Sequence, residues 1–111
     1  MLVRDIIEKL DLSIVAGENA LDNEITTVYV GDLLSWVMAN AKQGSIWITI
    51  QSHVNIVAVA SLLNLSCIIV AEGAHVDEEA IEKANNENIP IFSTDKDTYN
   101  LIKELIKIGI E

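Results

Sequence analysis

The chain has 111 residues, which is enough for one domain with a single hydrophobic core. Half of the residues are hydrophobic but only 5% are aromatic, so the core must be aliphatic, as in a parallel sheet buried on both faces. The formal net charge of −10 opposes binding to nucleic acid and to anionic membrane surfaces, and Arg4 is the single arginine available for phosphate. We therefore expect neither nucleic acid nor a membrane as a partner.

The sequence also bears on the compartment. Apolar runs stay shorter than the roughly 18 residues that a membrane span needs, and the N-terminus lacks the apolar segment of a signal peptide. Cys67 is the single cysteine, so it has no partner for a disulfide within the chain, and its apolar neighbours predict that it is buried. We expect a cytoplasmic protein.

The first thirty residues indicate a helix followed by two strands. Apolar residues recur every three or four positions over Leu2–Leu10, with charged residues between them, which is typical of an amphipathic helix. Leu12–Ala16 predicts a short strand, and Glu18–Asn23 has the composition of a turn. Glu24–Val30 alternates and is rich in β-branched residues, so we expect a second strand there.

A helix and then a β-α-β unit follow. We expect the helix over Leu33–Lys42, with Asp32 as its N-cap, because a carboxylate there can accept the free N–H groups of the first turn. The unit consists of the strand Ser45–Ile50, the helix Val54–Leu65 and the strand Ser66–Ala71. Its helix is apolar almost all round, which predicts that other elements enclose it.

The last third of the chain predicts two helices around a short strand. The first helix, Asp77–Glu87, has Asp77 as its cap and two glutamates in its first turn. Pro90–Phe92 is a short strand, where proline suits the first position. In the final helix, Lys96–Ile108, we expect Tyr99 and Ile106 to face inward with the other apolar residues.

The order of these elements determines the expected fold class. Strands and helices alternate from Leu33 onward, which implies right-handed crossovers and a mainly parallel sheet with helices on both faces. We therefore expect a three-layer α/β fold with about four to five strands, in which residues 1–111 form one domain. The pattern leaves open whether the strand Leu12–Ala16 joins the sheet antiparallel or lies outside it.

Polar residues gather where the predicted strands end. Ligands of open α/β sheets bind outside the carboxyl ends of the strands. The residues that we expect to line a ligand site there are Asp32, Thr49, Gln51, Ser52, His53, Asn55 and Glu72. Ser52 and His53 could bind an anion at the helix start, and His53 could titrate near neutral pH. The alternative is that Ser52 or His53 only caps the helix and closes the turn.

The sequence does not support catalysis. No nucleophile elbow precedes Ser52, and no glycine-rich phosphate loop is present. Asp95 and Asp97 are expected to cap the last helix rather than to act as a catalytic pair. His53 and His75 lack the spacing of a metal site, so we predict neither a metal nor another cofactor. A hydrolase or transferase activity would require Ser52 and His53 in hydrogen-bond contact.

The two tryptophans have different expected roles. Trp47 alternates with isoleucines and should lie in the core, whereas Trp36 belongs either to the core or to a dimer interface. With a mean hydropathy of +0.34, the chain has more apolar side chains than a small core readily hides. We expect a homodimer. An alternative function is a protein-interaction module that acts through Trp36 and the apolar helix faces without a small ligand.

Seven segments together resemble one known family. They are Ile14–Gly17, Val30–Ser35, Trp47–Ile50, Asn55–Ala60, Ile68–Gly73, Ile89–Asp95 and Thr98–Tyr99. On these segments the chain resembles, over nearly its whole length, a DRTGG domain standing alone. Such domains occur beside CBS domains and in some phosphotransacetylases, and they resemble the N-terminal domain of HPr kinase/phosphorylase.

The resemblance implies a regulatory or ligand-sensing module, commonly dimeric, with no established catalytic activity. It implies no kinase activity, because the kinase phosphate loop belongs to another domain. The chain also departs from the family pattern: it has no Asp-Arg-Thr-Gly-Gly run, and where many relatives carry Asp-Arg it reads Gln51-Ser52-His53. We therefore expect a non-enzymatic regulatory domain that binds a small metabolite or a nucleotide, with any anion binding dependent on a histidine.

Overall fold

The computed structural model of the protein describes residues 1–110. Its helices are α1 (Val3–Lys9), the 3-10 helix η1 (Glu18–Ala20), α2 (Leu34–Asn40), α3 (Asn55–Leu63), α4 (Glu78–Glu87) and α5 (Thr98–Lys107). Its strands are β1 (Ser13–Ala16), β2 (Thr27–Val30), β3 (Ser45–Thr49), β4 (Cys67–Val70) and β5 (Ile91–Ser93). All five expected helices and five expected strands are present, and most of them are shorter than the residue ranges expected from the sequence.

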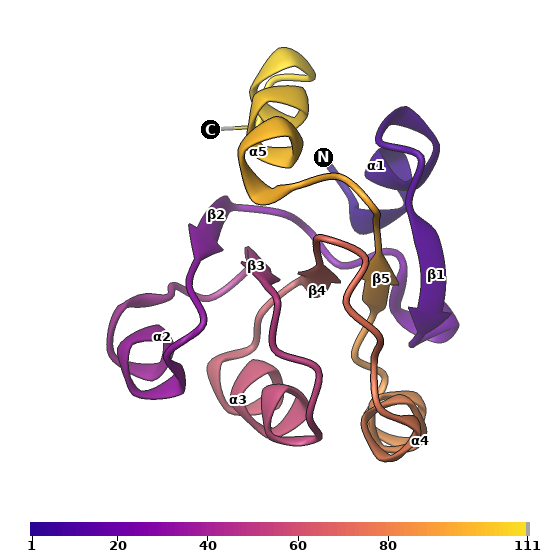
Figure 1. The fold of residues 1–111 in the computed structure, drawn as a ribbon, viewed down its shortest axis with the longest axis vertical. Coiled ribbons are helices and arrows are strands. Elements are labelled where there is room, and N and C mark those ends of the chain that lie inside the picture. The colour runs from indigo at the N-terminus through magenta and orange to yellow at the C-terminus, as the bar shows by residue number, and fades with distance from the viewer. Residues whose placement is uncertain (111) are drawn as a thin grey trace.

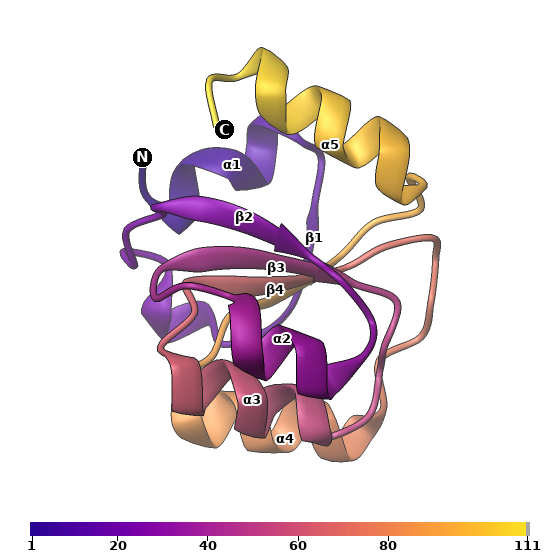
Figure 2. The same cartoon turned by 90° about the vertical axis from the view of Figure 1, so that its left-hand side faces the viewer.

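The strands form one sheet in the order β1-β5-β4-β3-β2. Strands β2 to β5 are parallel, and β1 pairs antiparallel with β5, which settles the question of the first strand. Helices α1 and α5 cover one face of the sheet, and α2, α3 and α4 cover the other (Figure 1). The view along the sheet from the β2 side shows the same three layers (Figure 2). The three-layer α/β prediction is confirmed.

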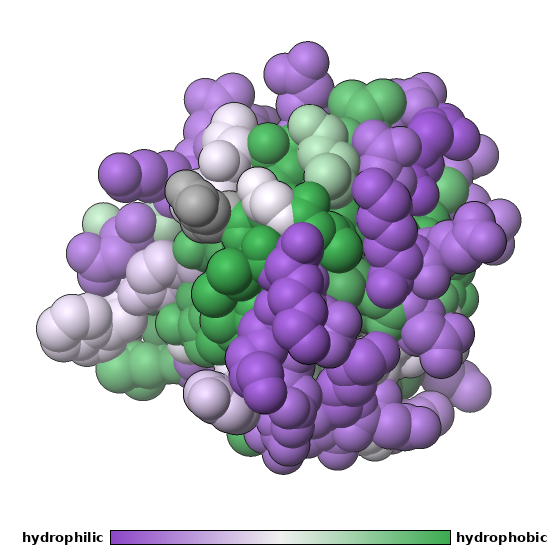
Figure 3. Space-filling model, turned by 90° about the horizontal axis from the view of Figure 1, so that it is seen from above, coloured by the Kyte–Doolittle hydropathy of each residue, from purple (hydrophilic) through white to green (hydrophobic). Residues whose placement is uncertain are grey.

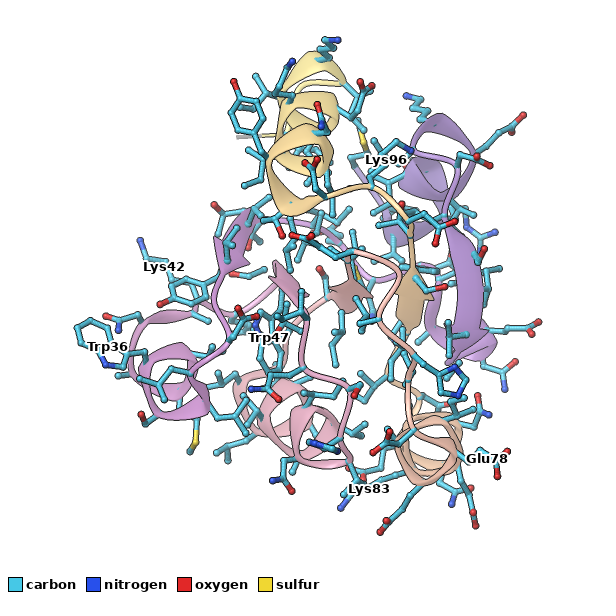
Figure 4. All side chains as sticks on the ribbon, viewed as in Figure 1. Trp36, Lys42, Trp47, Glu78, Lys83 and Lys96 are labelled. Carbon is cyan, nitrogen blue, oxygen red and sulfur yellow. The ribbon has the colours of Figure 1, made fainter. Side chains whose placement is uncertain are left out.

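The core is divided into two layers by the sheet. On β3, Trp47 packs with the α2–α4 layer, while Ile46 and Ile48 pack with the α1–α5 layer, as alternation along a strand requires. Trp47 is completely buried, and its indole N–H donates to the Gly31 carbonyl at 2.8 Å. Figure 4 shows Trp47 inside the molecule and Trp36 pointing away from it. The prediction that Trp47 lies in the core is confirmed. Trp36 does not lie in the core.

Two expected burial patterns are wrong in detail. Tyr99 and Ile106 of α5 are 71% and 58% exposed, because the buried stripe of this helix runs through Leu101 and Leu105. Helix α3 does lie between α2 and α4, but Leu62 on its outer side is 66% exposed. Hydrophobicity by itself does not tell which side of an apolar helix has neighbours.

The lone cysteine lies in the central strand β4 and is completely buried. Burial raises the pKa of the Cys67 thiol to about 12, although a hydrogen bond with Ser66 acts in the opposite direction. Among the described residues, no helix is long and apolar enough to cross a membrane.

Candidate functional site

Parallel strands β2, β3 and β4 end at the same edge of the sheet, and the loops that follow them carry the expected site residues. The residues are Asp32 after β2, Thr49, Gln51, Ser52, His53 and Asn55 at the end of β3 and in the loop into α3, and Glu72 after β4. Asn55 is the exposed first residue of α3, and the structure divides the other six residues into three groups with separate hydrogen-bond partners. We describe the groups in the order of the strands.

The first group joins Asp32, Thr49 and Gln51. The Asp32 carboxylate accepts the Thr49 hydroxyl at 2.8 Å and the N–H of Ile50 at 2.9 Å. The Gln51 amide donates to the Asp32 carbonyl at 3.0 Å, and the Gln51 N–H donates to the Thr49 hydroxyl at 3.1 Å. These bonds tie the β2–α2 loop to the β3–α3 loop.

This group corrects one expectation. Asp32 does not cap α2: the residue at the N-cap position is Leu33, and the Asp32 carboxylate turns toward β3 instead. Thr49 is only 2% exposed and its hydroxyl both donates and accepts, so its visible role is to hold the loops together. Asp32 and Gln51 are the members of this group that reach the surface.

The second group is the hydrogen-bonded pair of His53 and Asp77, which links the start of α3 to the start of α4. His53 Nδ1 lies 2.7 Å from a carboxylate oxygen of Asp77, with the two side chains 71% and 44% exposed. The N–H of Asp77 donates to the Ser52 carbonyl at 3.1 Å. Asp77 does occupy the N-cap position of α4, but its carboxylate bonds to His53 rather than to the helix.

Sequence reasoning missed Asp77 as a member of the site. The two residues are separated by 24 positions, and an aspartate at a helix start is already explained by capping. The pair also bears on catalysis, because His53 makes its described hydrogen bond to Asp77 and not to Ser52. Neither Ser52 nor His53 caps α3, whose N-cap position holds Val54 without a side-chain bond.

The third group attaches Glu72 to the start of α5. Glu72 has a left-handed backbone conformation with φ of 63°, and its N–H donates to the Lys96 carbonyl at 2.9 Å. Its carboxylate is 3.4 Å from the Thr98 hydroxyl and 3.5 Å from the Thr98 N–H, at the long limit for hydrogen bonds. Glu72 therefore faces the β5–α5 loop rather than His53 or Asp32.

The electrostatics of this edge do not favour a phosphate group. Asp32, Glu72 and Asp77 all contribute carboxylates, whereas the nearby ammonium of Lys96 donates to the Leu10 carbonyl at 2.7 Å, toward α1 (Figure 4). His53 is the one basic side chain of the expected site, and Asp77 is already beside it. Such an edge suits ligand hydroxyl and amino groups, which donate hydrogen bonds to carboxylates.

Two of the concave surfaces lie beside and opposite the expected site. A hollow of about 260 Å³ between β5 and the β4–α4 loop includes His75. A larger hollow, of about 600 Å³, lies at the opposite edge, where the parallel strands begin and α3 and α4 end. Its polar lining residues include Asn23, Glu24, Asn64, Glu87 and Asn88. No sequence motif marks it, because separate loops and helix ends build it together. In residues 1–110 no three His, Cys, Asp or Glu side chains are grouped as metal ligands.

Comparison with known proteins identifies the family and the fold. The sequence model of the DRTGG domain matches residues 5–108. The structure is similar to that of the CBS and DRTGG domains of the regulatory region of Clostridium perfringens pyrophosphatase, which was solved in complex with the activator diadenosine tetraphosphate. The similarity has a TM-score of 0.76 at 21% identity and covers 95% of this chain but only 46% of that one. Among curated proteins, none matches.

Proposed function

Because this chain belongs to the DRTGG domain family, we propose that it is a non-enzymatic regulatory domain that senses a small metabolite, with a nucleotide as the first candidate. The ligand binds where β2, β3 and β4 end. The observation that carries this proposal is the exposed His53–Asp77 pair, which joins two helix starts beside the Asp32–Gln51 group. A ligand that bonds to this pair would change the connection between α3 and α4.

The absence of catalysis is proposed on two grounds. Among the described residues no hydrogen bond joins Ser52 to His53, and an activated serine nucleophile needs that bond. The Cys67 thiol is buried and its pKa is raised to about 12, which keeps it protonated and unreactive.

The chemistry of the edge favours one part of a nucleotide over another. Carboxylates of Asp32, Glu72 and Asp77 accept from ribose hydroxyls or from the amino group of a base, while the amides of Gln51 and Asn55 both donate and accept. The pyrophosphatase region that shares this fold binds diadenosine tetraphosphate, which makes adenine nucleotides a sensible first set of probes.

We also propose that the domain works as a homodimer in the cytoplasm. Leu33 and Trp36 are 60% and 63% exposed, and large apolar side chains in such positions are typical of surfaces that associate.

A thermal-shift experiment tests the ligand proposal. Adenosine, AMP, ATP and diadenosine tetraphosphate are each added to the wild type and to a His53→Ala/Asn55→Ala variant. We expect at least one probe at a hundred times its Kd to stabilise the wild type by about 2.7 kcal/mol and to raise its melting temperature, with a smaller rise for the variant.

The matched control is Asn19→Ala/Asn86→Ala, which removes two exposed asparagines away from the strand ends. It should respond to the ligand as the wild type does. An equal rise in the wild type and the His53 variant contradicts the proposed site. If no adenine nucleotide stabilises the wild type, the nucleotide proposal is wrong.

The exposure of Trp36 supports a second candidate, a protein-interaction module without a small ligand. In that case Trp36→Glu abolishes the regulatory function of the domain in the cell, whereas His53→Ala/Asn55→Ala leaves that regulatory function unchanged. The ligand-sensing candidate predicts instead that His53→Ala/Asn55→Ala abolishes the regulatory function. Measuring that function in both variants therefore separates the two candidates.

A further inference from the structure

The sheet has two outer strands, and they differ in how they are protected against pairing with another chain. In β1 the register shifts between Ile14 and Ala16, and such irregularity discourages the addition of a strand. In contrast, β2 has the sequence Thr27-Val28-Tyr29-Val30, without a charge or a proline, and it pairs with β3 in unbroken register. Figure 2 looks onto this edge and shows β2 with no other segment in front of it. β2 is thus the less protected edge.

The backbone of β2 offers hydrogen-bonding groups on this outer side. The N–H of Gly31, directly after the strand, donates inward to the Ile48 carbonyl at 3.1 Å. Because successive N–H groups along a strand point to opposite sides, the N–H of Val30 faces away from β3, and so does that of Val28. These are the groups that an additional strand would bond.

Apolar side chains border the open edge on both faces of the sheet. On the α5 side there is a hollow of about 300 Å³, lined by Val28, Ile102, Leu105, Ile106 and Ile110. Figure 3, which looks onto that side, shows a band of apolar residues bordered by hydrophilic ones. On the other side, Leu33 and Trp36 are exposed, and Trp36 points outward beyond the edge (Figure 4). An added strand would therefore be covered by apolar groups above and below.

The charges near the edge indicate which partner fits it. Lys42 lies beside the first residues of β2, where it shares a small hollow with Thr27, Val28 and Tyr29, and Asp32 follows the end of the strand. If a second copy pairs antiparallel, a two-fold axis brings Lys42 of each copy toward Asp32 of the other. The edge is therefore complementary to itself in charge, which matters because two copies with a net charge of −10 each repel one another elsewhere.

From these observations we infer that β2 pairs antiparallel with β2 of a second copy of this chain, so that two five-stranded sheets form one continuous sheet. Val30 and Trp36 become buried between the copies, and the ammonium of Lys42 in each copy approaches Asp32 of the other, whose Oδ1 keeps its hydrogen bonds to Thr49 and Ile50. This inference rests on the proposed homodimer and specifies its surface.

Analytical ultracentrifugation tests the inference through variants of the two outer strands. The wild type should have twice the 12.2 kDa mass of one chain. Val30→Lys and Trp36→Glu should each raise the dimer Kd by at least about tenfold, and Lys42→Glu should raise it less. The matched control is Ile14→Lys on β1, since Ile14 and Val30 are 41% and 43% exposed. This control should leave the Kd unchanged.

Amide hydrogen exchange gives a readout that does not depend on any variant folding. In the wild type, the N–H groups of Val28 and Val30 should be protected in the dimer and should lose protection on dilution. A wild type that remains monomeric at about 100 μM overturns the homodimer and this surface, while the thermal-shift test of ligand binding still stands. A dimer that persists in folded Val30→Lys and Trp36→Glu, or unprotected Val28 and Val30 amides in a dimer, overturns this surface alone.

Discussion

At the scale of single residues, Gly17 shows how one backbone position joins distant parts of the fold. It follows β1 with φ of 74°, in the left-handed region, and a Cβ atom there would lie 2.2 Å from the Ile89 carbonyl oxygen. Its N–H donates to the Asn85 side chain at 2.8 Å. Glycine is needed here both for the conformation and for the close approach of two backbones.

We predict that Gly17→Ala lowers the free energy of unfolding by at least about 2 kcal/mol, because the new methyl group clashes with backbone atoms, which cannot shift without disturbing the fold. Urea unfolding followed by far-UV circular dichroism measures this difference. The control is Gly109→Ala, where φ is 95° but no atom lies within 4 Å of the added Cβ. It should cost only the conformational strain, about 1 kcal/mol. Equal costs for the two variants would show that the contact with Ile89 does not matter.

The site residues show what single positions reveal without a structure. The position of Asp32 and Gln51 at the strand ends follows from the order of the elements, and the structure places both there. Their hydrogen-bond partners do not follow from that order. The Asp32 carboxylate could cap α2 or turn toward Thr49, and it accepts hydrogen bonds in either arrangement. The pairing of His53 with Asp77 is less predictable still, since the packing of α3 beside α4 decides it.

At the scale of elements, α5 is the described helix whose N-cap side chain accepts a backbone N–H of its first turn. The Asp97 carboxylate accepts from the backbone N–H of Asn100 at 2.8 Å and from its side-chain amide. These hydrogen bonds, the backbone one first, lower the pKa of Asp97 below its ordinary value of 3.8. A lowered pKa means that the charged carboxylate stabilises the folded state above pH 3.8 and that this contribution is lost as the pH falls through the folded-state pKa.

We therefore predict that Asp97→Asn lowers the melting temperature at pH 7, because asparagine can still cap the helix but carries no charge. The difference from the wild type should shrink as the pH falls below 3.8. Melting curves of both proteins between pH 7 and pH 3 measure it. Asp95→Asn, two residues earlier in the same loop, is the control and should show a smaller difference at pH 7, because Asp95 is not the N-cap residue of α5. A difference that grows on acidification contradicts the role assigned to Asp97.

At the scale of the whole molecule, β4 lies at the centre of the sheet, and its cysteine reports on the entire fold. Cys67 is covered by helices α1 and α5 on its side of the sheet, so a reagent reaches the thiol only when these layers separate. We predict that Ellman's reagent labels the thiol in urea with the same midpoint at which far-UV circular dichroism is lost, as in two-state unfolding. Labelling at lower urea would show that the α1–α5 layer opens by itself.

The sequence by itself determined the class of fold, the sequence of helices and strands, and the edge of the sheet where the polar residues gather. It did so because the spacing of apolar residues is a local property, and because parallel strands must end at the same edge. The tertiary structure decided the rest: that β1 lies antiparallel at one border, that Tyr99 and Trp36 are exposed, and that His53 meets Asp77. Each of these depends on which elements become neighbours, and the spacing of residues along the chain does not contain that information.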